Sequence, residues 1–327
     1  MEVSIIIPTY NRVNELDDAL NSVLAQTVLP LEVIIVDDSD GDCVQQFAKE
    51  KTNVFSQKGI SLKFIRNFRQ RSLTIARNIG IDSANGDIIM FLDDDVILEN
   101  SYVLEILKVF QNFPDALGVQ GFISNYPVLS KIRNAFNVFF FLPHQEKNMA
   151  RVLPSWNNSY PSQLDSIIHC EWLSGSNHCL KRDIFKEFRY DEKLKRYCFK
   201  EDMDLSFRIF KKYPQSLFMT PFARLQHKHS PVGRMPGKNM ILMEYCYNFY
   251  FFYKNINQTF FNILIFYWSI IGYFVVAIPM AFIKSIFGSN EMIMRLNYSV
   301  NAFFISIKNI EKIKQGDLTF LDNLLIK

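Results

Sequence analysis

Residues 86–96 read GDIIMFLDDDV, and this stretch gives the strongest indication of the fold. The apolar run Ile88–Leu92 predicts a buried strand, because continuous apolar runs are typical of parallel strands covered on both faces. Asp93, Asp94 and Asp95 follow this strand directly. In open α/β sheets, ligands bind beyond the carboxyl ends of the strands. The stretch therefore predicts an α/β sheet with a ligand site at the end of this strand.

Strand and helix patterns alternate on both sides of this stretch. Apolar runs predict further strands at Val3–Ile7, Leu31–Val36, Leu62–Ile65 and Gly118–Ile123. Apolar spacing predicts helices around Leu16–Leu24, at Ser72–Ser83 and near Tyr102–Phe110. Continuous apolar strands between helices indicate a mixed, mostly parallel sheet with helices on both faces.

Composition and charge exclude several classes of protein. The net charge is +3, and no Lys/Arg block with interleaved aromatic residues occurs, which argues against a nucleic-acid partner. The five cysteines are scattered and form no CxxC pair, so we expect reduced thiols in a cytosolic compartment. Glu2 leads directly into a strand pattern, which predicts no signal peptide.

The aspartate triplet is the strongest candidate for a metal site. Side chains alternate along an extended segment, so Asp93 and Asp95 can face the same way. Two carboxylates on one side suit Mg²⁺ or Mn²⁺. Phosphate oxygens and water would complete the coordination shell of the cation. The alternative is a solvated strand end without a cation.

Asp38 and Arg77 are two further candidates for ligand binding. Asp38 follows the second strand and could accept hydrogen bonds from a base or a ribose, although DSDG is also good turn chemistry. Arg77 lies on the predicted helix before Gly80, and its guanidinium could meet a diphosphate. The alternative for Arg77 is an ordinary position on a helix surface.

An acidic pair and two histidines lie further along the chain. Glu201 and Asp202 begin a helix pattern, where a carboxylate could act as a general base or could simply suit the helix dipole. His227 and His229 end the segment ARLQHKH. A histidine there could be a metal ligand, a structural residue or an exposed side chain.

Taken together, these motifs resemble those of family 2 glycosyltransferases, which have the GT-A fold and invert the anomeric centre. The segments that match in order and spacing are SIIIPTYNR, VIIVDDSD, ARNIGID, GDIIMFLDDDV, WLSGSN, FRYDEKL and EDMDLSFRIFKKYP, followed by His227. The resemblance covers residues 3–230 approximately. It predicts a catalytic domain over residues 1–230 and a C-terminal, helical, membrane-associated region over residues 231–327.

The resemblance also implies roles for individual residues. Asp202 matches the catalytic base of the family. The implied metal ligands are Asp93, Asp95 and His227. The residues implied in nucleotide-sugar binding are Pro8, Thr9, Tyr10, Asp38, Arg77, Asp93 and Asp94. The residues implied near the acceptor and the donor sugar are Trp172, Gly175, Asn177 and Glu201.

The chain departs from the family pattern at two points. Residues 187–192 read EFRYDE, without the Gly-Gly that usually precedes this motif, so we expect a local turn that differs from that of relatives. No QxxRW motif occurs, which argues against a processive polysaccharide synthase. A polyprenyl-phosphate sugar synthase is the alternative within the same class of enzyme.

Two alternatives belong to other classes. A sugar-nucleotide pyrophosphorylase would carry a Gly-rich, basic phosphate loop near residue 10, where this chain has Thr9-Tyr10-Asn11-Arg12. A non-catalytic, sugar-nucleotide-binding membrane protein would not require Asp202. The sequence therefore favours transfer of a sugar from a nucleoside-diphosphate sugar to a hydroxyl acceptor.

The C-terminal region predicts membrane association. Residues 255–283 contain no charged side chain, and about 20 apolar residues suffice for a transmembrane helix. The alternative is a buried helix of a soluble protein. Nucleotide sugars are cytosolic, and the residues that follow the run are basic, which also favours the cytosol. We therefore expect shallow insertion at the cytoplasmic face, with breaks at Gly272 and Pro279, and a lipid-linked glycan as the acceptor.

Overall fold

A computed structural model describes residues 1–196, 198–230, 237–286 and 290–325, and for residues 284–286 it describes only the backbone. The chain falls into two compact units. The first comprises residues 1–127, 147–149 and 163–234, and the second comprises residues 128–146, 150–162 and 235–327. The division into domains at residue 230 remains a prediction, and most of the connector expected there, residues 231–236, lies outside the described residues.

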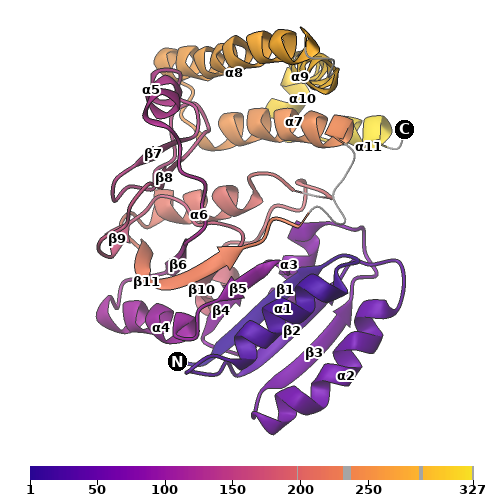
Figure 1. Cartoon of the computed structure of the whole chain (residues 1–327), viewed down its shortest axis with the longest axis vertical. Coiled ribbons are helices and arrows are strands. Elements are labelled where there is room, and N and C mark those ends of the chain that lie inside the picture. Colours follow the sequence, from indigo (N-terminus) through magenta and orange to yellow (C-terminus); the bar gives the residue numbers. More distant parts are fainter. Residues whose placement is uncertain (197, 231–236, 287–289, 326–327) are drawn as a thin grey trace. The chain divides into compact units, whose positions relative to one another are not determined.

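The first unit is built on a sheet of nine described strands, in the order β3-β2-β1-β4-β10-β6-β11-β5, with β9 paired to β11 (Figure 1). Their bounds are β1 Val3–Thr9, β2 Glu32–Asp37, β3 Ser61–Arg66, β4 Ile88–Phe91, β5 Val96–Leu98, β6 Gly118–Ile123, β9 Ile168–His169, β10 His178–Lys181 and β11 Leu217–His227. The pairs among β1 to β4 are parallel, as is β6 with β11, whereas β5, β9 and β10 run antiparallel to their neighbours. The mixed, mostly parallel sheet is as predicted.

Helices cover both faces of this sheet. They are α1 Val13–Leu24, α2 Cys43–Gln57, α3 Leu73–Ser83, α4 Tyr102–Asn112 and α6 Glu201–Lys212, with a 3₁₀ turn at Arg182–Lys186. Crossovers between parallel strands are right-handed. The helices α1 and α2 lead outward to β3, whereas α3 leads back to β4, so α3 lies on the opposite face of the sheet from α1 and α2. The helix α2 was not predicted, because only Val44, Ala48 and Phe55 of its residues are buried and its apolar pattern is weak.

The register of the central strands brings the candidate site together. Thr9 at the end of β1 lies beside Asp37 at the end of β2, and β4 pairs with the other side of β1. The helix α3 packs closely on β1, because a Cβ at Gly80 would lie 2.4 Å from a side-chain carbon of Ile6. The residues after β1, β2 and β4 therefore project from one edge of a rigid sheet.

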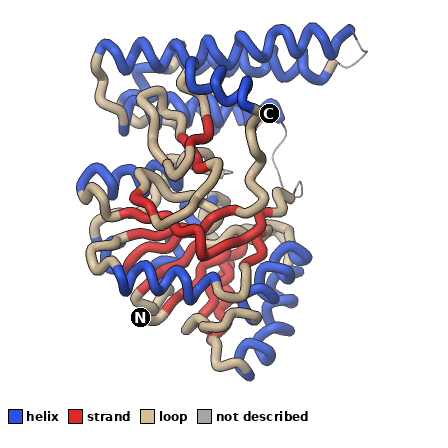
Figure 2. The backbone as a smooth tube through the Cα atoms, turned by 60° about the vertical axis from the view of Figure 1, so that its left-hand side comes forward, coloured by secondary structure: helices blue, strands red, loops and turns tan. Residues whose placement is uncertain are grey.

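The second unit is mainly helical (Figure 2). Its elements are α5 Lys131–Phe139, β7 His144–Glu146, β8 Ser159–Pro161, α7 Gly237–Asn255, α8 Phe260–Ile286, α9 Glu291–Lys308, α10 Ile310–Lys314 and α11 Phe320–Leu325. Among the described residues, α8 alone is long and apolar enough to cross a membrane.

The expected breaks at Gly272 and Pro279 do not occur, since both residues lie within α8. Gly272 serves packing instead of a break, because a Cβ there would lie 2.5 Å from the Cβ of Phe140. Trp268, one turn earlier on the same helix, stacks on the Phe140 ring with 4.8 Å between centroids. Close contact with residues 139–140 thus supports this part of the helix, where a glycine alone would weaken it.

Candidate active site

Asp93, Asp95 and His227 form a cluster at the end of β4. One ligand atom from each of the three lies within 4.8 Å of the others. The His227 Nε2 atom lies 2.9 Å from Asp95 Oδ1 and 4.0 Å from Asp93 Oδ2. The antiparallel pairing of β11 with β5 places His227 beside Val96, next to the aspartates. Two carboxylates and one imidazole are a donor set that suits Mn²⁺ or Mg²⁺.

Backbone groups hold this cluster in place. The Ser230 amide donates to Asp95 Oδ2 over 2.9 Å, and the His227 amide donates to Asn125 Oδ1 over 3.0 Å. Burial by itself would raise the pKa of Asp95, but the hydrogen bond and charge of His227 and the Ser230 amide lower it. Burial raises the pKa of Asp93 despite the neighbouring Arg77 and His227. A divalent cation would favour the charged form of both carboxylates.

Asp94 points away from the cluster, into contacts with the end of β1. Its Oδ2 accepts a hydrogen bond of 2.8 Å from the Thr9 hydroxyl, and its Oδ1 lies 2.9 Å from Arg12 Nη1. Burial raises the pKa of Asp94 to about 7, against the opposing effects of Arg12 and Thr9. Both of its oxygens thus have partners within the protein, and its assignment to the nucleotide sugar stays a prediction.

Arg12 is a site residue that the sequence reasoning missed. Its Nη1 lies 3.8 Å from Asp95 Oδ2, and its Nη2 donates to the Ser230 carbonyl over 3.3 Å. It therefore ties the loop after β1 to the segment after β11. Its position three residues after the end of β1, inside SIIIPTYNR, is the signal that could have identified it.

The residues predicted around the nucleoside meet at the ends of β1 and β2. Asp38 accepts hydrogen bonds from Asn67 Nδ2, at 2.6 Å, and from the Ser72 amide, at 3.1 Å. Burial raises the pKa of Asp38 to about 6, although both hydrogen bonds lower it. The Arg71 guanidinium lies 4.4 Å above the Tyr10 ring. Pro8 and Thr9 are buried in the last part of β1, so their side chains mainly support this corner.

Arg77 is almost completely buried, with 1% of its side chain exposed. Its Nη1 donates to Glu201 Oε1 over 2.8 Å, and its Nη2 donates to the Gly175 carbonyl over 2.9 Å and to Asp93 Oδ1 over 3.3 Å. Burial opposes its charge, but the surrounding Tyr190 and acidic groups keep its pKa above the ordinary value. Its assignment to the diphosphate is not tested by these contacts.

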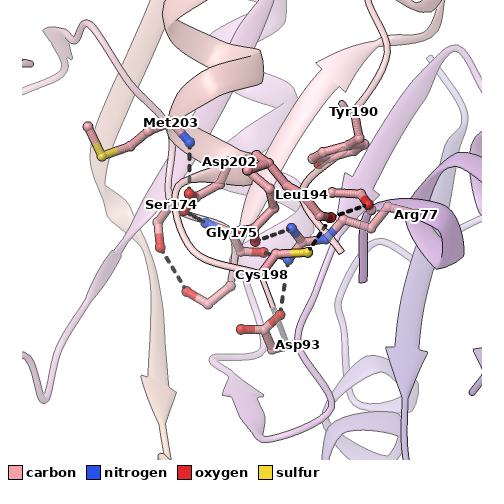
Figure 3. Close-up of polar contacts among 12 residues, drawn as sticks. Arg77, Asp93, Ser174, Gly175, Tyr190, Leu194, Cys198, Asp202 and Met203 are labelled. Carbon is pink, nitrogen blue, oxygen red and sulfur yellow. Dashed lines mark hydrogen bonds and ion pairs between the residues drawn. The ribbon is translucent and has the colours of Figure 1, made fainter. Parts of the chain in front are cut away.

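Glu201 and Asp202 begin α6, as predicted. Asp202 lies beside Gly175 (Figure 3), and Glu201 contacts Arg77. Lys200, directly before them, has a φ of 67°, a left-handed conformation that is uncommon for a side-chain-bearing residue. Asp202 is half-buried: its Oδ2 accepts from the Gly175 amide over 2.6 Å, and its Oδ1 accepts from the Met203 amide over 2.7 Å. Burial and the neighbouring Asp202 charge raise the pKa of Glu201 to about 7.

Trp172 and Asn177 occupy buried positions near the same loop. Trp172 is 6% exposed, and its carbonyl accepts a hydrogen bond from Gln120 Nε2. Asn177 is fully buried. Its side-chain Nδ2 donates to the Gly121 carbonyl, and its backbone carbonyl accepts from the Tyr102 hydroxyl. These contacts support the loop that carries Gly175. A direct contact of Trp172 or Asn177 with a sugar stays a prediction.

The geometry combines two functions at one edge of the sheet. The Asp93–Asp95–His227 cluster can hold a divalent cation. Asp202, fixed by two backbone amides, can accept a proton from a bound hydroxyl. Together with the strand-end residues Asp38 and Tyr10, these residues form a candidate active site of the kind that metal-dependent enzymes carry at the carboxyl edge of an α/β sheet.

Comparison with known proteins identifies the family. The Glycosyl transferase family 2 model matches residues 4–173, more than half of the chain, and the chain belongs to this family. The chain is therefore a glycosyltransferase. It is similar to the glucosyl-dolichyl phosphate glucuronosyltransferase of Haloferax volcanii, with 25% identity over 70% of this chain and 69% of the relative. It is also 28% identical to glycosyltransferase GlyA of Streptococcus pneumoniae over 38% of this chain and 17% of that protein.

Solved structures confirm the GT-A fold. The structure of GalNAc-T7 with UDP, GalNAc and Mn²⁺ matches 77% of this chain and 50% of that chain, with a TM-score of 0.57 and 18% identity. Residues 1–349 of TarS from S. aureus match 99% of this chain and 89% of that chain, with a TM-score of 0.52 and 15% identity. At these identities the likeness concerns the fold alone.

The cluster predicts a graded effect of His227 on metal use. His227→Ala removes one of the three candidate ligands and leaves two carboxylates, so the Mn²⁺ concentration for half-maximal turnover is expected to rise by about tenfold or more. The measurement is turnover against Mn²⁺ concentration. His229→Ala, which removes the imidazole whose ring centroid lies 4.0 Å from that of His227, is the control. An unchanged metal requirement in His227→Ala would leave His227 a structural residue.

Proposed function

We propose that this glycosyltransferase moves a sugar from a nucleoside-diphosphate sugar to a hydroxyl acceptor with inversion at the anomeric carbon. The observation that carries the proposal is the short connection between the metal cluster and the base. Arg77 Nη2 contacts both Asp93 Oδ1 and the Gly175 carbonyl, and the Gly175 amide holds Asp202. A carboxylate that can accept a proton therefore lies next to the residues that can hold a cation and a diphosphate.

The residues divide the chemistry between donor and acceptor. Asp93, Asp95 and His227 would hold Mg²⁺ or Mn²⁺, which would neutralise the diphosphate as it leaves. Asp202 would take the proton of the acceptor hydroxyl while that oxygen attacks the anomeric carbon. Each oxygen of Asp202 accepts from one backbone amide, which leaves a second lone pair on each oxygen for this task. One displacement inverts the configuration, and no second nucleophile is required.

The donor is proposed from the strand-end residues. Tyr10 and Asp38 would receive the nucleoside. The aromatic ring could stack on a base, and the half-buried carboxylate could bind the polar edge of the base or the ribose. The GalNAc-T7 structure with a similar fold contains UDP, GalNAc and Mn²⁺, which makes uridine donors and Mn²⁺ the first to test.

The acceptor is proposed to be a lipid-linked glycan. The name of the Haloferax relative specifies a glucosyl-dolichyl phosphate, a sugar on a lipid carrier. The second unit of this chain offers a surface for the membrane in which such a carrier lies. Its segments carry 11 Lys and Arg residues against 6 Asp and Glu residues, an excess of five positive charges that would favour anionic lipid.

The apolar surface of α8 supports this membrane association. Large apolar side chains are exposed along the helix: Phe260, Phe261, Leu264, Trp268, Ile271, Val275, Ile278, Met280, Phe282 and Ile283. From Phe261 to Ile278 they follow the three- and four-residue spacing of one helical face. The opposite side is covered within the same unit, where Phe266 stacks on Phe252 and contacts Phe249. A helix that is covered on one side and apolar on the other fits insertion parallel to the membrane plane better than a single span. We propose that it binds the cytoplasmic face, where nucleotide sugars occur.

Vesicle flotation tests the role of this face. Ile271→Glu with Ile278→Glu introduces two charges on the exposed side of α8, which should abolish flotation with vesicles that contain anionic lipid. The control is Val54→Glu, which places a charge on an exposed apolar position of α2 in the first unit and should leave flotation intact.

Fractionation and protease protection test the membrane proposal further. A wild-type protein that stays soluble at low salt without detergent contradicts membrane association. In sealed vesicles that display the catalytic unit outside, a C-terminal tag is expected to be cleaved. Protection of that tag would indicate a span in place of in-plane insertion.

The proposed activity has a direct test. Detergent-purified protein is incubated with a panel of nucleoside-diphosphate sugars and Mn²⁺, with and without membrane lipid extract, and release of nucleoside diphosphate is measured. One donor should be consumed faster when acceptor is present, and the product should have the opposite anomeric configuration. A product with the donor's configuration would contradict the inverting mechanism, and a polyprenyl phosphate acting as the sole acceptor would identify a synthase of lipid-linked sugars.

A further inference from the structure

Arg77 contacts both halves of the site, although it lies beneath the surface. Its side chain is 1% exposed, and its two terminal nitrogens are bonded to Glu201, to the Gly175 carbonyl and to Asp93. The ring of Tyr190 lies 5.3 Å from its guanidinium carbon. A guanidinium enclosed in this way has little surface left for a ligand. Its contacts are with the groups that would do the chemistry.

These contacts close into a ring. Arg77 Nη2 donates to the carbonyl of Gly175, and the amide of the same glycine donates to Asp202 Oδ2. Asp202 follows Glu201 in the chain, and Glu201 Oε1 accepts from Arg77 Nη1. The orientation of the Asp202 carboxylate is therefore linked to the position of the guanidinium through two short paths. A third contact, to Asp93 Oδ1, connects the ring to the metal cluster.

Gly175 lies between Arg77 and Asp202 (Figure 3), and a side chain there would crowd both groups. A Cβ at this position would lie 3.1 Å from Arg77 Nη2 and 3.2 Å from Asp202 Oδ2. Both distances are tighter than ordinary van der Waals contact, so the guanidinium or the carboxylate would have to shift by a few tenths of an ångström. The glycine thus allows the two groups to share one residue as their common hydrogen-bond partner.

We propose that Arg77 is a positioning residue, which sets the general base Asp202 and the metal ligand Asp93 in one geometry through Gly175 and Glu201. The guanidinium acts on the acceptor side through the Gly175 peptide groups and on the donor side through Asp93. Glu201 balances its charge within the buried site. This role rests on the proposed function, and it differs from the sequence-based expectation that Arg77 binds the diphosphate.

Kinetics separate the two roles. Arg77→Lys keeps the charge, but a single ammonium lacks the planar fork that reaches Glu201, Gly175 and Asp93 together. The positioning role predicts that kcat falls about 100-fold while the donor KM changes less than about threefold. A diphosphate ligand would instead show a donor KM raised about tenfold or more with kcat nearly unchanged, and that result would overturn the proposal.

Gly175→Ala tests the ring without removing a buried charge. We expect kcat to fall at least about tenfold, with the melting temperature close to that of the wild type. Gly237→Ala is the matched control, because nothing lies within 4 Å of a Cβ built at that glycine. Wild-type kcat in Gly175→Ala would contradict the proposal.

A fall in kcat that results from lower protein stability must be distinguished from one that results from a displaced Asp202 carboxylate. Arg77→Met combined with Glu201→Gln removes both partners of the buried ion pair, which should recover part of the melting temperature lost in Arg77→Met. The positioning role predicts that kcat stays low in this double variant. Recovery of kcat together with stability would show that Arg77 only supports the fold. Arg208→Met, which breaks an ion pair with Asp204 on α6 outside the ring, should lower the melting temperature and leave kcat intact.

A structural readout needs no turnover. In crystal structures, Asp202 Oδ2 is expected within hydrogen-bond distance of the Gly175 amide in the wild type and to be displaced from it in Gly175→Ala. An undisplaced carboxylate would overturn the proposed ring. If the wild type transfers no sugar from any donor, the proposed function fails, whereas this comparison still shows whether Arg77 and Gly175 set the carboxylate.

Discussion

Asp202→Asn is expected to abolish sugar transfer while donor binding stays close to that of the wild type. The amide keeps the size of the carboxylate, but it cannot accept the proton of the acceptor hydroxyl. A general base is worth about 10²–10⁴-fold in rate, and kcat should fall by that amount. The donor side should be spared, because the contacts of Asp202 are to the backbone of Gly175 and Met203 and not to the metal cluster.

The measurement is kcat for transfer beside the Kd of the donor measured by titration. Asp82→Asn, which changes an exposed carboxylate on α3, serves as the control and should keep both values. If Asp202→Asn retains more than about half of the wild-type kcat, against the loss expected for a general base, Asp202 is the wrong residue. Glu201 is then the next candidate, since burial and the Asp202 charge raise its pKa to about 7.

Removal of the divalent cation is expected to stop turnover. Excess EDTA should abolish transfer, and Mg²⁺ or Mn²⁺ should restore it, because the charge on the leaving diphosphate requires neutralisation. Asp95→Asn should lower kcat/KM at least about 100-fold, since Asp95 contributes a carboxylate to the cluster and is 4% exposed. Full turnover in excess EDTA would contradict the metal-dependent mechanism.

Asp94→Asn is the matched control for this prediction. Asp94 is the next residue and equally buried, yet its carboxylate contacts Thr9 and Arg12. The metal concentration that gives half-maximal turnover of Asp94→Asn should equal that of the wild type. A second readout avoids turnover: Mn²⁺ should raise the melting temperature of the wild type and of Asp94→Asn, but not that of Asp95→Asn. Equal stabilisation of all three proteins would place the metal elsewhere.

Much of the α/β sheet could be predicted from local pattern. The strand at Gly118–Ile123 was predicted with the bounds that the structure shows, and Ile88–Leu92 differs from β4 by one residue. Ile88–Leu92 is a continuous apolar run bounded by polar residues, whereas Gly118–Ile123 is mostly apolar with Gln120 inside it. Both strands lie in the buried centre of the sheet, where apolar residues are required. The helix α2 escaped prediction, because it is largely exposed and its few buried residues do not make a clear stripe.

The sequence predicted the candidate site as a set of residue types at strand ends. The family resemblance then gave each of these residues a role. The pattern of alternating side chains after β4 separated Asp93 and Asp95 from Asp94, and the structure places the first two beside His227 and turns the third toward Arg12. The partner of Asp94 could not be read from sequence, because Arg12 is 82 positions away.

The features that the sequence could not predict depend on contacts between distant segments. Arg77 reads as a surface residue or as a ligand residue in its helix, but Glu201, 124 positions later, and Gly175, 98 positions later, enclose it. Gly272 and Pro279 read as breaks, yet α8 continues through both, with Phe140 packed against Gly272. Local pattern reports what a segment needs from its surroundings, such as burial or charge balance. Which residue meets that need depends on how the sheet and the helices pack, since packing brings together side chains that no local spacing relates.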